Sequence, residues 1–207
     1  MTARPLLVIG TSNRKKAAEL VQLLAPVGLE VRTLADYPQA AIVEETGDSF
    51  AANSRLKAVE QARRLGHWVL GEDSGLAVDA LSGAPGIFSA RFAGSAASDE
   101  ENNRHLLQQL KGTPLEKRTA HYVCHIAVAD PQGTVRAESK GFCRGRIRLE
   151  PAGAGGFGYD PLFEIVEYHR TFGELGPAVK AVLSHRARAA SLIASQLIEL
   201  VDTGHWV

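Results

Sequence analysis

The sequence predicts an α/β protein, because short apolar runs typical of buried strands alternate with segments of helical periodicity. Residues 6–9 (Leu-Leu-Val-Ile) form the first apolar run, and a helical segment follows over residues 14–25. Residues 119–129 alternate between two faces, as a strand does. The segment from residue 185 onward carries an apolar stripe at helical spacing.

The first half of the chain contains recognisable helix boundaries. Asn13 can cap the first helix, and Pro26 helps to end it. Residues 29–34 form a second candidate strand. Another helix is expected over residues 50–65, with Asp48 or Ser49 as its cap and a glycine after it.

The second half is predicted to contain one helix before a hairpin and one helix at its end. A helix capped by Ser98 or Asp99 runs to about residue 110. Residues 134–149 are the expected hairpin partner of the alternating strand. The segment 172–183 is less regular, and Ser184 can cap the last helix.

The stretch from Gly71 to Gly94 is the most unusual part of the sequence. It contains five glycines and one proline, which predict turns. Glu72 and Asp73 come directly after the apolar residues 68–70, so we expect them to close a short buried strand. Buried carboxylates need a partner, and a divalent cation is a common one for oxygen ligands. The alternative is a turn with exposed acids.

Two helix starts carry cations where the helix dipole is already positive. Arg14, Lys15 and Lys16 occupy the first turn of the first helix. His185 and Arg186 occupy the first turn of the last one. A bound anion such as phosphate would remove this conflict. The alternative is that these cations are simply solvated.

A second glycine-rich stretch covers residues 151–161. Its spacing matches G-x-G-x-x-G, but Tyr159-Asp160-Pro161 prevents the helix that a dinucleotide-binding motif requires. A glycine loop of this kind can bring its backbone close to a flat ligand, and Phe157 or Tyr159 can stack on a base. A tight connection between strands is the alternative.

The composition excludes some classes of protein. The 207 residues include 23 Lys and Arg against 23 Asp and Glu, so the zero net charge argues against a partner that is a nucleic acid polymer. No apolar run is long enough for a signal sequence or a membrane span, so no membrane partner is expected. Both cysteines are expected to be reduced, and together these observations predict a cytoplasmic protein. Zinc binding by His121, Cys124 and His125 is not expected, because the thiol lies on the opposite strand face.

Taken in order, several motifs over residues 6–201 resemble the inosine triphosphate pyrophosphatase family, which hydrolyses non-standard purine nucleoside triphosphates. The motifs are Thr11-Ser12-Asn13-Arg14-Lys15-Lys16, Glu44-Glu45-Thr46-Gly47, Asn53 with Lys57, Asp73-Ser74-Gly75-Leu76, Ala84-Pro85-Gly86-Ile87, Ser89-Ala90-Arg91, Gly155-Gly156-Phe157-Gly158-Tyr159-Asp160-Pro161, and Lys180 with Ser184-His185-Arg186. Each motif is weak alone, whereas the ordered set is specific.

The resemblance implies a fold and a reaction. The fold is one elongated α/β domain over residues 1–207, with a long mixed sheet flanked by helices and two lobes with an active-site cleft between them, usually as a homodimer. The reaction converts a purine nucleoside triphosphate such as ITP, dITP or XTP, with water, into the monophosphate and pyrophosphate. It requires magnesium, and manganese could replace it.

The resemblance also implies roles for individual residues. Asp73 would accept a proton from the attacking water and, with Glu45 and Glu72, would hold the metal. Thr11, Asn13 and Lys16 would hold the phosphates, with Lys57 nearby, and the substrate would also contact Ser12, Arg14 and Lys15. The rest of the substrate would contact Ser74, Phe157, Gly158, Tyr159, Asp160, Lys180, His185 and Arg186.

Three positions depart from the usual pattern of the family. Glu72 stands where an aspartate is more common, which leaves its role open. Ala52 and Val179 replace acids that often precede Asn53 and Lys180. None of the three changes removes a residue that is assigned to the chemistry.

Base selectivity has a partial explanation in the residues. Hypoxanthine and xanthine carry a keto oxygen at C6, and Arg186 and His185 can donate to it. Adenine carries an amino group there, so a donor would face a donor. No residue can be named that rejects guanine. Two other functions stay open: a pyrophosphatase for other modified nucleotides, and a nucleotide sensor without turnover.

Overall fold

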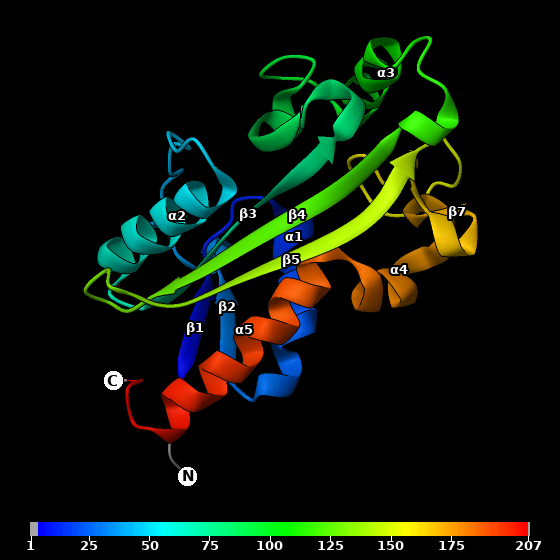
Figure 1. Ribbon diagram of the computed structural model, residues 1–207. Helices are drawn as coiled ribbons and strands as arrows, with labels where there is room; N and C mark the ends of the chain where they lie inside the picture. Colours follow the sequence, from blue (N-terminus) through cyan, green and yellow to red (C-terminus); the bar gives the residue numbers. More distant parts are fainter. Residues whose placement is uncertain (1–3, 207) are drawn as a thin grey trace. The chain divides into compact units, whose positions relative to one another are not determined.

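The computed structural model describes residues 4–206, and seven strands form one mixed sheet in the order β2-β1-β3-β4-β5-β6-β7 (Figure 1). The predicted α/β class with a long mixed sheet is confirmed. The elements are β1 (Leu6–Ile9), α1 (Arg14–Leu24), β2 (Glu30–Thr33), α2 (Phe50–Leu65), β3 (Trp68–Val78), α3 (Asp99–Gln109), β4 (Thr119–Ala129), β5 (Val135–Ile147), β6 (Phe163–Ile165), β7 (Arg170–Thr171), α4 (Phe172–Leu183) and α5 (His185–Asp202).

The chain divides into two compact units. The first contains the described residues up to Asp73, Cys124–Gly141 and those from Arg186 onward. The second contains Ser74–Val123 and Phe142–His185. The expectation that residues 1–207 form a single domain stays a prediction.

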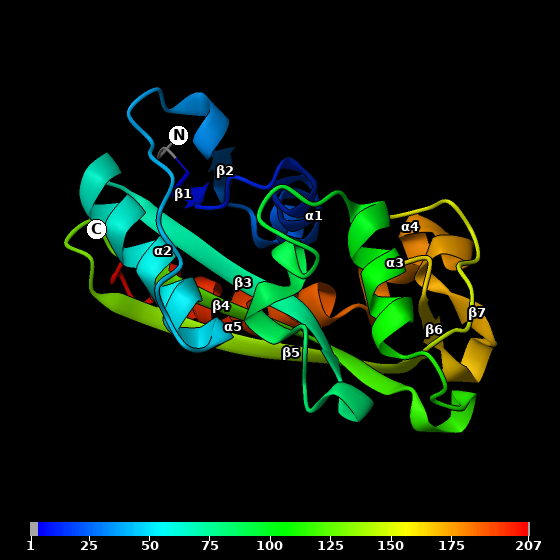
Figure 2. The same ribbon diagram turned by 90° about the horizontal axis from the view of Figure 1, so that it is seen from above.

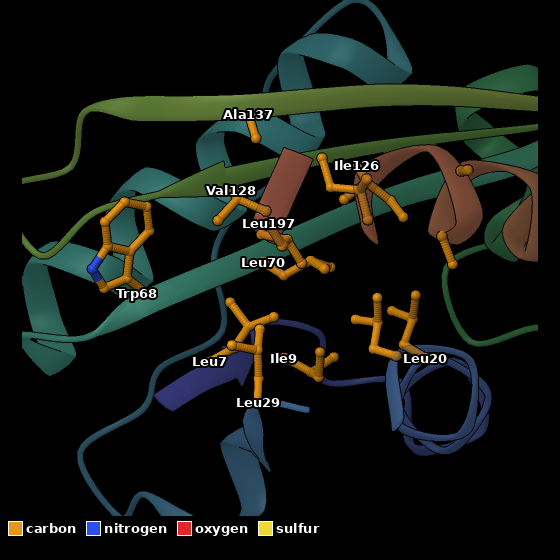
Figure 3. Packing of buried hydrophobic residues seen from close by; sticks show 14 of the residues in the cluster. Leu7, Ile9, Leu20, Leu29, Trp68, Leu70, Ile126, Val128, Ala137 and Leu197 are labelled. Atoms are coloured by element: carbon orange, nitrogen blue, oxygen red, sulfur yellow. The ribbon is translucent and has the colours of Figure 1, made fainter. Parts of the chain in front are cut away.

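In the first unit, parallel strands are covered by helices on both faces. β1 pairs in parallel with β2 and β3, as expected for strands joined through helices. Leu7 and Ile9 pack with α1 and α5, whereas Val8 packs with α2, because successive side chains of a strand point to opposite faces. Figure 3 shows the first of these cores. Trp206 stacks on Trp68 of this core, with ring centroids 4.3 Å apart.

In the second unit, β5, β6 and β7 pair antiparallel. Their core contains Tyr122, Phe163 and Phe172, whose rings lie within 6.5 Å of one another. Ser98 caps α3, accepting a hydrogen bond from the backbone of Glu101, as predicted. Figure 2 shows these elements, from α3 in green to α4 in orange.

The expectation that Glu72 and Asp73 end a short strand in a turn is wrong. β3 continues through both acids to Val78. Gly71 is needed for packing rather than for a turn, because a Cβ there would lie 2.2 Å from the backbone oxygen of Ser54 in α2. The two acids therefore lie in the middle of a rigid, buried strand.

The C-terminal helices agree with expectation in part. Residues 172–183 form α4, which is kinked at Gly176, where φ is 77°, just before Pro177. The predicted stripe of α5 is buried at Ala189, Ile193 and Leu197, whereas Leu192 is exposed.

Candidate active site

A lysine lies between two carboxylates in the first unit. Lys57 on α2 places its Nζ 2.6 Å from Glu45 Oε1 and 2.9 Å from Asp73 Oδ1. The same Nζ donates to the backbone oxygen of Glu72 at 3.1 Å. Asn53, one turn earlier on α2, donates to the other carboxylate oxygen of Asp73 at 3.3 Å. We call Glu45, Asn53, Lys57 and Asp73 the lysine–carboxylate cluster.

Burial controls the protonation of this cluster. It raises the pKa of the Asp73 carboxyl above its ordinary value, and the positive charges of Lys57 and Lys16 only partly oppose that effect. Burial also disfavours the charged form of Lys57, but Asp73 and Glu45 outweigh it and raise the pKa of that ammonium. Asp73 is thus a buried carboxylate with increased basicity, as a general base requires.

Glu72 lies in a different environment from Asp73. Its fully buried carboxylate accepts a hydrogen bond from Arg186 at 3.0 Å and pairs with Lys16 Nζ at 3.0 Å. Arg186 also pairs with Glu19 of α1, and the Cys124 thiol lies 3.4 Å from Glu72. We call Lys16, Glu19, Glu72 and Arg186 the buried ion-pair cluster.

This cluster changes the interpretation of the cationic helix starts. The sequence predicts a bound anion beside Lys16 and Arg186, and the protein itself supplies one in Glu72. Both terminal nitrogens of Arg186 contact carboxylates, and the residue is 1% exposed. Base recognition by Arg186 therefore stays a prediction, and its observed partners are acids.

The N-terminus of α1 is capped by Asn13 and is exposed to solvent. Asn13 caps α1 by accepting hydrogen bonds from the backbone of Lys15 and Lys16 at 3.0 and 3.1 Å. Thr11 is buried and accepts a hydrogen bond from the backbone of Asn13. The side chains of this stretch that are exposed to solvent belong to Ser12, Asn13, Arg14 and Lys15.

In the second unit, three predicted residues meet at the glycine loop. Lys180 Nζ pairs with Asp160 Oδ2 at 2.6 Å and lies 4.2 Å from the centre of the Phe157 ring. The same Asp160 oxygen accepts the backbone N–H of Phe157 at 2.9 Å. Phe157, Asp160 and Lys180 thus fix one another, and Val179 does not prevent this placement of Lys180.

The other predicted residues of the second unit have separate partners. Tyr159 is buried and donates its hydroxyl to the backbone oxygen of Ser89 at 2.8 Å. The His185 ring stacks on Tyr122 with centroids 4.6 Å apart. Ser74 lies on β3, directly after Asp73, and is partly buried. Gly158 is held through its backbone by α3.

Sequence reasoning missed several residues of these clusters. Glu19 and Cys124 contact partners that are distant in sequence, so no local pattern marks them. Asp99 and Asn103 of α3 bond to Gly158, and the sequence marks them only by their spacing of four along a helix and by Asp99 as a candidate cap.

The oxygen ligands available for magnesium are those of Glu45 and Asp73. Both lie against a single cation, the Lys57 ammonium, so the two carboxylates together keep a net negative charge that a metal ion could offset. Glu72 fits this set poorly, because Lys16 and Arg186 already neutralise its buried carboxylate. Among residues 4–206 no group of three His, Cys, Asp or Glu side chains is placed to hold a metal ion. Magnesium often takes only one or two carboxylates and completes its shell with water and phosphate.

Comparison with known proteins identifies the family. The sequence model of the Ham1 family matches residues 7–196. The chain belongs to the Ham1 family. Among curated members, a dITP/XTP pyrophosphatase of Rhodopirellula baltica is 51% identical over 95% of each chain. Another, of Geobacillus kaustophilus, is 46% identical over 94% of this chain and 95% of the relative.

Solved structures of Ham1 proteins share the fold. The HAM1 protein of Coxiella burnetii superimposes with a TM-score of 0.85 at 34% identity, covering 94% of this chain and 99% of the other. The Ham1 protein of Staphylococcus aureus gives a TM-score of 0.82 at 35% identity, covering 93% and 97%. Within the described part of the chain, no helix has the length and apolar character needed to cross a membrane.

Proposed function

We propose that this Ham1-family protein hydrolyses non-standard purine nucleoside triphosphates, namely ITP, dITP and XTP, to the monophosphate and pyrophosphate. Curated relatives that match nearly the whole chain carry the name dITP/XTP pyrophosphatase. The observation that carries the proposal is the buried Asp73 carboxylate, held 2.9 Å from Lys57 Nζ and increased in basicity by burial.

The lysine–carboxylate cluster can perform the proton transfer of this reaction. Asp73 accepts a proton from the attacking water, and Asn53 and Lys57 fix the orientation of its carboxylate. Lys57 supplies positive charge for the phosphates and for the leaving pyrophosphate, whereas Lys16, which pairs with Glu72, stays a predicted phosphate contact. Glu45 and Asp73 would hold magnesium, which would supply charge neutralisation on the phosphate oxygens.

Phe157 is the proposed stacking surface for the base. Its ring is held by Lys180 and its backbone N–H by Asp160. Stacking accepts any purine, so selectivity for a C6 keto group requires a donor, for which His185 and Arg186 stay the predicted residues. A homodimer and a cytoplasmic location also stay proposals, which rest on the family resemblance and the composition.

The decisive experiment is a nucleotide panel. With ITP, dITP, XTP, GTP, dTTP and ATP at one magnesium concentration, we expect pyrophosphate release from the first three, with kcat/KM about 5- to 150-fold below them for ATP. Preferential turnover of a pyrimidine nucleotide would support the other pyrophosphatase function. ITP binding without pyrophosphate release would identify a sensor.

Metal removal tests the proposed role of Glu45 and Asp73. We expect EDTA to abolish turnover and magnesium or manganese to restore it, because both ligands are hard oxygens. Calcium should bind but support little turnover, since its looser coordination misplaces the reacting groups. Glu45→Gln should raise the magnesium concentration needed for half-maximal activity, whereas Glu44→Gln, at the exposed neighbouring acid, is the control. Full activity after exhaustive chelation would contradict the metal proposal.

A further inference from the structure

The glycine loop that presents Phe157 is held by helix α3 through the backbone of Gly158. The Gly158 N–H donates to Asp99 Oδ2 at 2.9 Å. The Gly158 carbonyl accepts from Asn103 Nδ2 at 2.9 Å. Asp99 and Asn103 are four residues apart and thus share one face of α3. Both backbone groups of Gly158 are therefore fixed by side chains of one rigid helix.

The loop needs such support because its glycines are conformationally free. Gly156 and Gly158 have φ of 76° and 62°, in the left-handed region that glycine adopts at little cost. A glycine that enters this region easily also leaves it easily, so contacts outside the backbone must select the conformation. Asp160 holds the loop on one side through the Phe157 N–H. Asp99 and Asn103 hold it on the other.

Helix capping does not explain the placement of Asp99. Ser98 already caps α3, and the Glu101 side chain completes the capping box by accepting the Ser98 N–H at 2.7 Å. Glu100 and Glu101 also supply negative charge to the first turn, where it suits the helix dipole. The contact of Asp99 with Gly158 is thus additional to what the helix requires.

We propose that Asp99 and Asn103 are positioning residues that hold the loop so that Phe157 stays in place to stack on the purine base. They act through the backbone of Gly158, the residue next to Phe157. The stacking role rests on the proposed function, whereas the restraint of the loop does not. The two parts can be tested separately.

The restraint is tested by amide hydrogen exchange in the full chain without nucleotide. Asp99→Ala and Asn103→Ala should each speed exchange of the peptide that covers residues 156–160 by about 10-fold or more, because each removes a bond to Gly158. The controls are Glu100→Gln, which removes an exposed acid from the same turn, and Gln109→Ala, which removes an exposed amide from the same helix. Both controls should exchange as the wild type does. Because the two variants act on opposite groups of Gly158, failure of one to fold leaves the other as the test.

The stacking role is tested by kinetics with ITP and with pyrophosphate as an inhibitor that lacks a base. The two variants should raise KM for ITP by about 5- to 20-fold and change the inhibition constant of pyrophosphate by less than about 2-fold. A general structural defect would instead weaken both ligands.

The outcomes separate the two proposals. Exchange in both variants at the wild-type rate would overturn the restraint by α3. Faster exchange with an unchanged KM for ITP would overturn its link to base binding. A wild-type protein that does not hydrolyse ITP would contradict the proposed function, while the exchange result would still decide whether α3 holds the loop.

Discussion

Asp73→Asn should lower kcat for ITP by at least about 100-fold, the usual effect of losing a general base. The amide keeps the shape of the side chain and can accept a hydrogen bond from either Lys57 or Asn53, but it cannot accept the proton. Burial raises the pKa of Asp73 in the folded protein, so the wild-type group has the basicity that the amide lacks. Steady-state pyrophosphate release at saturating ITP measures the effect.

The matched control is Asp79→Asn. Asp79 follows β3 and its side chain is 59% exposed, so the substitution removes a carboxylate from the same segment without touching the lysine–carboxylate cluster. Its kcat should stay close to that of the wild type. An Asp73→Asn variant that folds and turns over ITP at a near wild-type rate would remove Asp73 from the role of proton acceptor.

The local features of the fold were predictable because short-range physics determines them. Asn13, Ser49 and Ser98 each cap the helix that follows, as their side-chain oxygens and positions indicate. The alternation of β4 was visible in its apolar pattern for the same reason. Such signals depend only on neighbours within one turn or one strand.

Features that depend on distant parts of the chain were not predictable. Gly71 suggests a turn in sequence, but its role is to let the backbone of α2 approach β3. Residues 172–183 were expected to be less regular, and the break at Gly176 agrees, but the helical turns on both sides of it were not predicted. A glycine in the sequence is compatible both with a turn and with close approach of a neighbouring backbone, so the sequence alone does not distinguish these two roles.

In the candidate site too, contacts set by local geometry were easier to predict than contacts between distant residues. Lys57 and Asn53 lie one turn apart on α2, so helix geometry allows both to face one site, and the structure shows that this site contains Asp73. The partner of Glu72 did not, since Arg186 is 114 residues away. The sequence interpretation therefore assigned a metal to Glu72 and a base to Arg186, whereas the structure pairs these two residues with each other.

The pairing predicts a large loss of stability when Glu72 is removed. Glu72→Ala should lower the free energy of unfolding by about 3–5 kcal/mol, because it leaves the buried Arg186 and the nearby Lys16 without their shared carboxylate. Urea denaturation measures this change. Glu138→Ala is the control, since Glu138 forms an exposed pair with Arg55 and should cost about 1 kcal/mol or less.

A second, milder substitution of Glu72 tests whether this residue binds the metal. Glu72→Gln keeps the volume of the side chain and two hydrogen-bonding atoms, so enough folded protein should remain for kinetics. If Glu72 acts only within the buried ion-pair cluster, this variant should need about the same magnesium concentration for half-maximal activity as the wild type, unlike Glu45→Gln. A rise of about 10-fold or more, matching that of Glu45→Gln, would make Glu72 a metal ligand after all. Stability near that of the wild type for Glu72→Ala would show that Arg186 does not depend on this carboxylate.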